Sequence, residues 1–290
     1  MLNRQYLAET KLFIILNVAI FLITFISSTA SAESPAESYY NSGSDYYKLE
    51  HYEEAITALD KAIAINPKYG DAYGLRGLVN ERLKHYEQAI ADFSKAIDFD
   101  PQSAGKYFLR GRVYFWSDQL KPAIADLSKA ITLKPRFGEA YFCRGLVYTD
   151  LKQYEQALVD FDNALTINPK HAASYLRRGI RYYYLNRCEQ AVTDFNQAIA
   201  INPLDAEAYY QRSLAYSRLK QYEKVIADCD QAIAINPNYS KAYAIKGATL
   251  PLLGRTQEAI DAFRQCIRIG DNPTLVDIAK KSITKLGGTP

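Results

Sequence analysis

Residues 138–171 read GEAYFCRGLVYTDLKQYEQALVDFDNALTINPKH, and residues 172–205 repeat the pattern as AASYLRRGIRYYYLNRCEQAVTDFNQAIAINPLD. Tyrosines and prolines carry the same period along the chain, with steps of 34 residues and no insertion. A fixed period of this length indicates repeats that pack on their neighbours. The recurring residues are Tyr39, Tyr73, Tyr107, Tyr141, Tyr175, Tyr209 and Tyr243, and Pro67, Pro101, Pro135, Pro169, Pro203 and Pro237.

The spacing within one copy is helical. Tyr141, Gly145 and Tyr148 follow one another at i, i+4 and i+7, as residues on one helix face do. A second apolar series around Phe161 marks a facing helix, and the small residues allow the two helices to approach closely. The pair Asn168–Pro169 closes this second helix, because the residue before a proline is pushed out of the helical region. Each copy is therefore predicted to be a helix–turn–helix unit.

The order aromatic, small, aromatic, alanine, aromatic, alanine and proline over 34 residues resembles the tetratricopeptide repeat. The resemblance covers residues 36 to about 273. It implies an all-α fold, a right-handed α-solenoid of seven helix-turn-helix repeats. The repeats are expected to stack on one another, because a single unit buries too little surface to be stable alone. The predicted repeats are residues 36–69, 70–103, 104–137, 138–171, 172–205, 206–239 and 240–273.

The C-terminal end departs from the regular pattern. Pro251 falls inside the predicted first helix of the seventh copy, so this helix is expected to kink or to end early. Residues 274–286 carry one apolar stripe and are predicted to form a capping helix over the last repeat. Gly287 stops this helix and begins the tail, residues 287–290.

The first 32 residues differ from the repeats. A basic start, an apolar run from Leu12 to Ile26 and a final Ala-Ser-Ala form the three-part pattern of a secretory signal peptide. Cleavage after Ala32 would leave residues 33–35 as a linker and a periplasmic, lumenal or secreted protein. The alternative retains residues 12–28 as a membrane anchor, although spanning helices usually need about 20 apolar residues.

Copies two to six share an arginine in the first helix and an aspartate in the second. Copy one has Ser42 and Ala58 at these positions, and copy seven has Lys246 and Ala262. The co-occurrence predicts a partly buried ladder of internal ion pairs, since arginine can bond a carboxylate in two places. The alternative, an arginine array for an acidic ligand, is weakened by the matched aspartates. The pairs are Arg76 with Asp92, Arg110 with Asp126, Arg144 with Asp160, Arg178 with Asp194 and Arg212 with Asp228.

The resemblance implies a ligand-binding groove along the first helices. Large apolar side chains occupy the corresponding positions, and an exposed apolar stretch of this kind usually marks a binding site. The expected ligand is a peptide segment or a partner helix. The alternative is that adjacent first helices bury part of this set against each other. The predicted groove residues are Phe108, Arg112, Phe115, Trp116, Phe142, Leu146, Leu176, Arg177, Ile180, Tyr183, Tyr184, Tyr210, Leu214 and Arg218.

Charge and chemistry narrow the function classes. The net charge is only +3, and the groove positions carry equal numbers of acidic and basic residues, so no nucleic-acid partner is expected. No nucleophile–base set and no glycine-rich phosphate loop occur, so we expect no enzyme, no cofactor and no small-molecule substrate. Three histidines are interpreted as turn residues, and no metal site is expected. Export would permit disulfides, but Cys143, Cys188, Cys229 and Cys266 allow three pairings and the sequence selects none.

The function predicted from these features is a non-enzymatic, exported scaffold that holds a protein segment in its groove. The first alternative is a membrane-tethered assembly factor for a membrane or extracytoplasmic complex. The second is a purely structural or oligomerising module. Tetratricopeptide arrays serve many pathways, so the identity of the partner does not follow from the fold.

Overall fold

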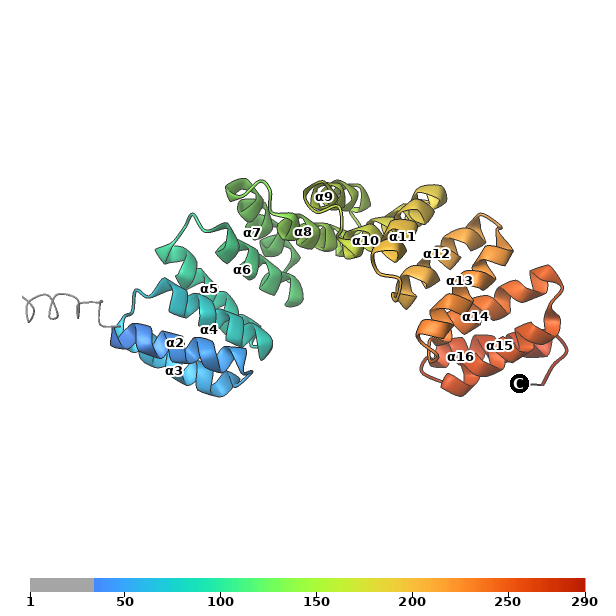
Figure 1. Ribbon diagram of the computed structural model, residues 1–290, viewed down its shortest axis with the longest axis horizontal. Coiled ribbons are helices and arrows are strands. Elements are labelled where there is room, and N and C mark those ends of the chain that lie inside the picture. Colours follow the sequence, from blue (N-terminus) through green and yellow to red (C-terminus); the bar gives the residue numbers. More distant parts are fainter. Residues whose placement is uncertain (1–33, 290) are drawn as a thin grey trace, which may run out of the picture. The chain divides into compact units, whose positions relative to one another are not determined.

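The computed structural model describes residues 34–289, and the predicted signal peptide or anchor lies outside the described residues. The described part contains fifteen α-helices and one short 3-10 helix, with no strand among them (Figure 1). Consecutive helices form the predicted helix–turn–helix units. The all-helical α-solenoid of the tetratricopeptide type is thus confirmed as the fold class.

Every repeat supplies a first and a second helix. The first helices are α2 (Pro35–Lys48), α4 (Gly70–Arg82), α6 (Ala104–Trp116), α8 (Gly138–Asp150), α10 (Ala172–Tyr184), α12 (Ala206–Arg218) and α14 (Ser240–Thr249). The second helices are α3 (Tyr52–Ile65), α5 (Tyr86–Phe99), α7 (Leu120–Leu133), α9 (Tyr154–Ile167), α11 (Cys188–Ile201), α13 (Tyr222–Ile235) and α15 (Thr256–Ile269).

The chain divides between Phe99 and Asp100 into two compact units. The first unit contains α2 to α5, and the second contains α6 to α16. Within each unit a first helix packs on its own second helix, which packs on the next first helix. In the second unit, the neighbouring first helices α6, α8, α10 and α12 also contact one another. Because of this contact, the predicted groove residues of successive repeats lie on helices that are direct neighbours.

The turn inside each repeat depends on one residue with a left-handed backbone. Lys152 has φ 59° and Asn186 has φ 60°, and the equivalent residues of the other repeats also have positive φ. Only the seventh repeat places a glycine there, Gly254 at φ 74°. A left-handed conformation is unfavourable for a residue with a Cβ atom. The surrounding helix packing therefore imposes this conformation on six non-glycine residues.

The turn between repeats is stabilised by its asparagine as well as by its proline. The Asn168 side-chain oxygen accepts a hydrogen bond from the backbone N–H of Lys170 at 3.1 Å. Asn66 and Asn236 make the same bond to the residue two positions later. The Asn-Pro pair thus ends the second helix by two separate effects, a local side-chain bond and the steric effect of proline.

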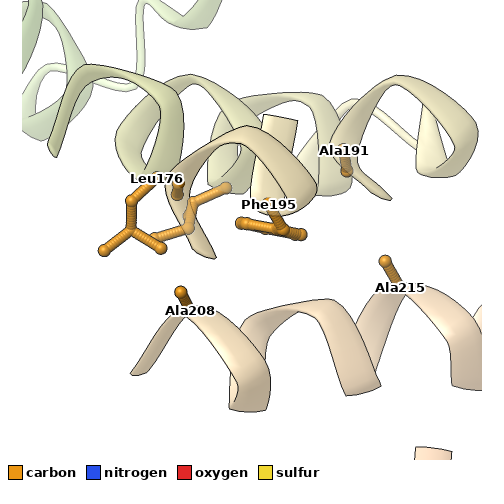
Figure 2. Close-up of a cluster of buried hydrophobic side chains, with 7 residues drawn as sticks. Leu176, Ala191, Phe195, Ala208 and Ala215 are labelled. Carbon is orange, nitrogen blue, oxygen red and sulfur yellow. The ribbon is translucent and has the colours of Figure 1, made fainter. Parts of the chain in front are cut away.

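In six of the seven repeats the core consists of small residues around one large side chain at a common position, and in the sixth repeat Cys229 takes that position. Figure 2 shows Phe195 and Leu176 facing Ala208 and Ala215 of α12. The alanines allow the close approach that the sequence pattern predicts. Gly145 belongs to the same design, since a Cβ atom there would lie only 2.7 Å from the ring of Phe161.

The seventh repeat ends irregularly. Helix α14 stops at Thr249, and the 3-10 helix η1 (Leu250–Leu253) contains Pro251, as expected for a proline at this position. Helix α16 (Pro273–Lys285) then packs on α15 and α14, with Ala279 and Ile283 buried. None of the helices in residues 34–289 has the length and apolar character needed to span a bilayer.

Candidate functional site

The five arginine–aspartate pairs are in contact. Arg144 donates from Nε and Nη2 to the two carboxylate oxygens of Asp160, both at 2.8 Å. The other four pairs have the same two-point geometry, with distances from 2.6 to 3.0 Å. The carboxylates are buried, and Asp160 is only 1% exposed. Two parallel charge-assisted bonds hold each guanidinium in one orientation.

The same arginines also join successive repeats. The third donor of Arg144, Nη1, bonds the Ser128 hydroxyl of the preceding repeat at 2.8 Å. Arg178 and Arg212 reach Asp162 and Asn196 of their preceding repeats in the same way, each at 2.6 Å. Each of these guanidinium groups therefore links its own hairpin to the previous one.

Two tyrosines flank the guanidinium in repeats three to six. The guanidinium carbon of Arg144 lies 5.7 Å from the ring centroid of Tyr141 and 5.8 Å from that of Tyr148. Burial raises the pKa of Asp160, and the hydrogen bonds from Arg144 oppose this effect. Each of these arginines is thus paired with a carboxylate of its own repeat and flanked by two tyrosine rings.

The predicted groove residues lie on α6, α8, α10 and α12, and we call their surface the first-helix face. Two of them do not belong to an accessible surface. Leu176 is 8% and Ile180 is 5% exposed, and both pack in the core cluster with Phe195 (Figure 2). Their assignment to a groove is therefore corrected, because the contact between neighbouring helices covers them. Phe115, Leu146 and Leu214 are half-buried on this face.

The α6 part of the first-helix face is aromatic and cationic. The guanidinium carbon of Arg112 lies 5.5 Å from the ring centroid of Phe108 and 5.1 Å from that of Trp116. Phe108 also packs against Phe137, with 4.9 Å between ring centroids. Trp116 remains 49% exposed. A large aromatic ring with one free surface is the kind of side chain that anchors a protein partner.

A cavity of about 270 Å³ lies beside α8. Phe142, Glu139, Lys134 and His171 are among the side chains that line it. The rings of Phe142 and His171 meet edge-on with 4.9 Å between their centroids, so His171 packs as an aromatic residue. The cavity places one predicted groove residue, Phe142, at a concave surface of mixed charge.

Helix α10 carries the most exposed part of the face. Tyr184 is 58% exposed and packs edge-on against Tyr183, with 5.7 Å between ring centroids. Arg218 of α12 covers Tyr183 at 3.8 Å from the ring centroid and donates to the Tyr183 carbonyl oxygen at 2.8 Å. Arg177 is exposed on the same helix. Tyrosine and arginine from neighbouring repeats thus form one continuous patch.

A buried arginine beside this patch is not among the residues predicted from the sequence. Arg181 is 9% exposed, and its Nε atom is buried without a hydrogen-bond partner. Its guanidinium carbon lies 5.3 Å from the ring centroid of Tyr154 and 5.2 Å from that of Tyr184. Burial lowers the pKa of Arg181. Comparison of the repeats could have revealed it, because Val79, Val113 and Val147 occupy the equivalent position.

The α12 part of the face is held by a polar contact. The Tyr239 hydroxyl donates to the carboxylate of Glu207, which also accepts from the Gln211 side chain at 2.5 Å. The ring of Tyr210 meets Tyr239 edge-on at 5.3 Å between centroids. Burial raises the pKa of Tyr210 to about 12. Tyr210 is therefore a packed, neutral side chain that supports the surface around it.

The remaining candidates for chemistry are the cysteines and possible metal ligands. Cys188, Cys229 and Cys266 are buried thiols, and burial raises the pKa of Cys229 to about 12. A raised pKa disfavours the thiolate, which is the nucleophilic form of cysteine. Within residues 34–289 no group of histidine, cysteine or acidic side chains is placed to hold a metal ion.

Sequence profiles identify the repeats independently. Profiles described as tetratricopeptide repeat match residues 40–104, 138–171, 206–239 and 240–270, and a profile described as TPR repeat matches residues 179–220. Together these matches cover well over half of the chain. None of the matched profiles describes a catalytic family. No curated protein resembles the chain closely enough to count as a match.

Solved structures share the fold. YrrB, described as a TPR protein with an unusual peptide-binding site, is 25% identical with a TM-score of 0.55, over 64% of this chain and 95% of that one. A tetratricopeptide repeat protein from Parabacteroides merdae is 21% identical with a TM-score of 0.63, over 86% and 98% of the two chains. PilW, described as a type IV pilus biogenesis factor, is 18% identical with a TM-score of 0.64, over 73% and 97%.

The profiles, the solved structures and the helix pairs agree on a fold that supports a scaffold for protein–protein interaction. The 34-residue period, the small residues between the helices and the closing Asn-Pro turn are all present in the folded chain. The chain therefore belongs to the tetratricopeptide repeat family.

Proposed function

We propose that the chain is an exported, non-enzymatic scaffold that binds a protein segment on its first-helix face. The observation that carries this proposal is the patch of exposed and half-buried tyrosine, tryptophan and arginine residues on α6, α10 and α12. Tyr184 and Trp116 are 58% and 49% exposed. Aromatic and arginine side chains dominate the energetics of protein interfaces, and large exposed apolar patches usually mark interaction sites.

The charge of the patch favours a segment that carries acidic side chains. Arg177, Arg181 and Tyr184 follow at i, i+4 and i+7 on α10 and so lie on one face. Arg181 has a buried Nε atom without a hydrogen-bond partner, and Asp150 is the acidic residue whose charge acts on it. A carboxylate of the bound segment would pair with Arg177, which is exposed one turn before Arg181.

The peptide-binding description of YrrB agrees with this proposal, because that protein shares the repeat architecture at 25% identity.

The proposal of export rests on the N-terminal residues 1–32, whose three-part pattern is that of a signal peptide. N-terminal sequencing of the protein isolated from its host tests this part. Glu33 as the first residue supports export with cleavage, whereas Met1 favours the tethered assembly factor and contradicts cleavage.

A photo-crosslinking amino acid at Tyr184, in the native host, tests the binding face. We expect a discrete protein adduct that is lost in the Trp116→Ala and Arg177→Glu variants. Both residues are exposed, so these variants should fold. The matched control places the crosslinker at Val159, which is 59% exposed on the second helix α9. A partner captured at Val159 and not at Tyr184 would contradict the proposal.

A further inference from the structure

The ladder arginines occupy a recurrent cage. In repeats three to six, one tyrosine precedes the arginine by three residues and another follows it by four. Both rings lie 5.4–5.9 Å from the guanidinium carbon. The aspartate of the second helix completes the cage with two hydrogen bonds. The fold has thus built the same guanidinium site four times from its own residues.

The first repeat keeps the two rings and lacks the arginine. Tyr39 and Tyr46 stand at the tyrosine positions of α2, whereas Ser42 replaces the arginine and Ala58 replaces the aspartate. Both tyrosines are 38% exposed. A cavity of about 340 Å³ lies among these four residues. This volume is within the range of about 300–1,000 Å³ that is usual for ligand sites.

The charge of the cavity suits a cation. Glu53 and Glu54 of α3 line it, and Lys61 is the basic residue at its edge. The Lys61 ammonium lies 5.4 Å from the ring centroid of Tyr39, within the distance at which a cation and an aromatic ring attract each other. Two carboxylates against one ammonium leave a formal charge of −1 in the lining.

The other repeats of the described chain do not offer the same site. In repeat two Arg76 fills the position and bonds Asp92 and Asp60. In repeat seven Lys246 is present and pairs with Asp230, while Leu250 replaces the second tyrosine. The combination of two tyrosine rings, a cavity in place of the arginine and two nearby glutamates belongs to the first repeat.

We propose that the cavity of the first repeat binds an arginine side chain presented by a partner protein. The incoming guanidinium would lie between Tyr39 and Tyr46, as Arg144 lies between its tyrosines, and Glu53 or Glu54 would replace the missing aspartate. A planar guanidinium fits this arrangement better than an ammonium, because it stacks on rings and bonds a carboxylate at two points. The site lies in the first compact unit and does not depend on the first-helix face.

The experiment measures binding of N-acetyl-arginine methylamide to the purified chain by ligand-observed NMR, with the equivalent lysine compound as comparison. We expect millimolar binding of the arginine probe and about tenfold weaker binding of the lysine probe. Tyr46→Ala should weaken the arginine probe about tenfold. The double variant Ser42→Arg/Ala58→Asp should abolish binding, because it fills the cage with an internal pair, and should raise the Tm.

Tyr184→Ala is the control for the other proposed surface and should leave probe binding unchanged. Equal binding of the two probes would overturn the guanidinium assignment. Binding that survives both Tyr46→Ala and the double variant would overturn the site itself. The absence of probe binding at millimolar concentrations would overturn the proposal altogether. Because Tyr184 is in the second unit, a failure here leaves the crosslinking result on the first-helix face unaffected.

Discussion

Asp160 connects α8 and α9 through a single buried carboxylate. Its two oxygens accept from Arg144, and removal of the carboxylate would leave a mostly buried guanidinium with the Ser128 hydroxyl as its remaining hydrogen-bond partner. Asp160→Ala should therefore lower the free energy of unfolding by about 3 kcal/mol. Urea denaturation followed by circular dichroism measures this value.

An exposed ion pair of the same chain provides the control for Asp160. Glu155 accepts from Arg187 at 2.9 Å, and the two side chains are 64% and 43% exposed. Glu155→Ala should cost less than about 1 kcal/mol, because solvent screens such a pair. Equal losses in the two variants would contradict a special role for the buried pairs.

Arg181 should behave in the opposite way, because it is a buried cation without a paired carboxylate. Valine occupies the equivalent position in three other repeats and is fully buried there. Arg181→Val should therefore raise the free energy of unfolding by about 1–3 kcal/mol. The exposed neighbour Arg177 gives the control, since Arg177→Val should change stability by less than about 0.5 kcal/mol. A lower Tm for Arg181→Val would mean that the two tyrosine rings more than offset the burial of the charge.

At the scale of the elements, the close approach of α8 and α9 depends on Gly145. An added Cβ atom would lie 2.7 Å from Cε1 of Phe161, which is itself fully buried. Gly145→Ala should therefore destabilise the protein by about 1–3 kcal/mol, as overpacked cores do. Thermal denaturation of the purified variant gives the measurement.

Gly105 of α6 separates this steric effect from helix propensity. A Cβ atom there would find its nearest contact at 3.9 Å, the Ser103 hydroxyl. Gly105→Ala should be neutral or stabilise by up to about 1 kcal/mol, because alanine loses less conformational entropy than glycine. Destabilisation of both variants by the same amount would contradict the close-packing explanation.

For the whole molecule, α16 decides how the array ends. Its Ile283 is fully buried among Phe263, Ile260 and Cys266 of α15, whereas Ile278 of the same helix is 47% exposed. Ile283→Asp should detach α16, lower stability by about 3 kcal/mol and expose the apolar surface of α15. Exposed repeat surfaces associate, so the sedimentation coefficient should rise with concentration. Ile278→Asp should sediment like the wild type, and self-association of that variant would contradict the capping role.

The two proposed binding sites lie in different units. The first-helix face belongs to the second unit, and the cavity of the first repeat belongs to the first. A scaffold with two separate sites can hold two segments of one partner or two partners. The repeat architecture makes this possible, because each repeat can replace its surface residues while its core pattern stays unchanged.

The repeat architecture and the internal ion pairs could be predicted from the amino-acid sequence alone. The 34-residue period, the helical spacing of Tyr141, Gly145 and Tyr148, and the break at Pro251 all describe local preferences or nearest-neighbour packing. A comparison of the seven copies reveals such features, because each copy either repeats the pattern or departs from it at particular positions. The Arg144–Asp160 pair could be predicted for the same reason, because its two members appear and disappear together along the chain.

The accessibility of individual residues on the first helices depends on tertiary packing and could not be predicted from the sequence. Leu176 and Tyr184 both lie on α10 and were both predicted to line the groove, yet one is buried and the other is 58% exposed. The structure likewise revealed the left-handed turn residues, such as Lys152, and the cavity between Tyr39 and Tyr46. Exposure and cavities depend on how neighbouring hairpins pack and on which side chains are missing. Sequence periodicity predicts which residues share one face of a helix, whereas the contact between neighbouring helices determines how much of that face is covered.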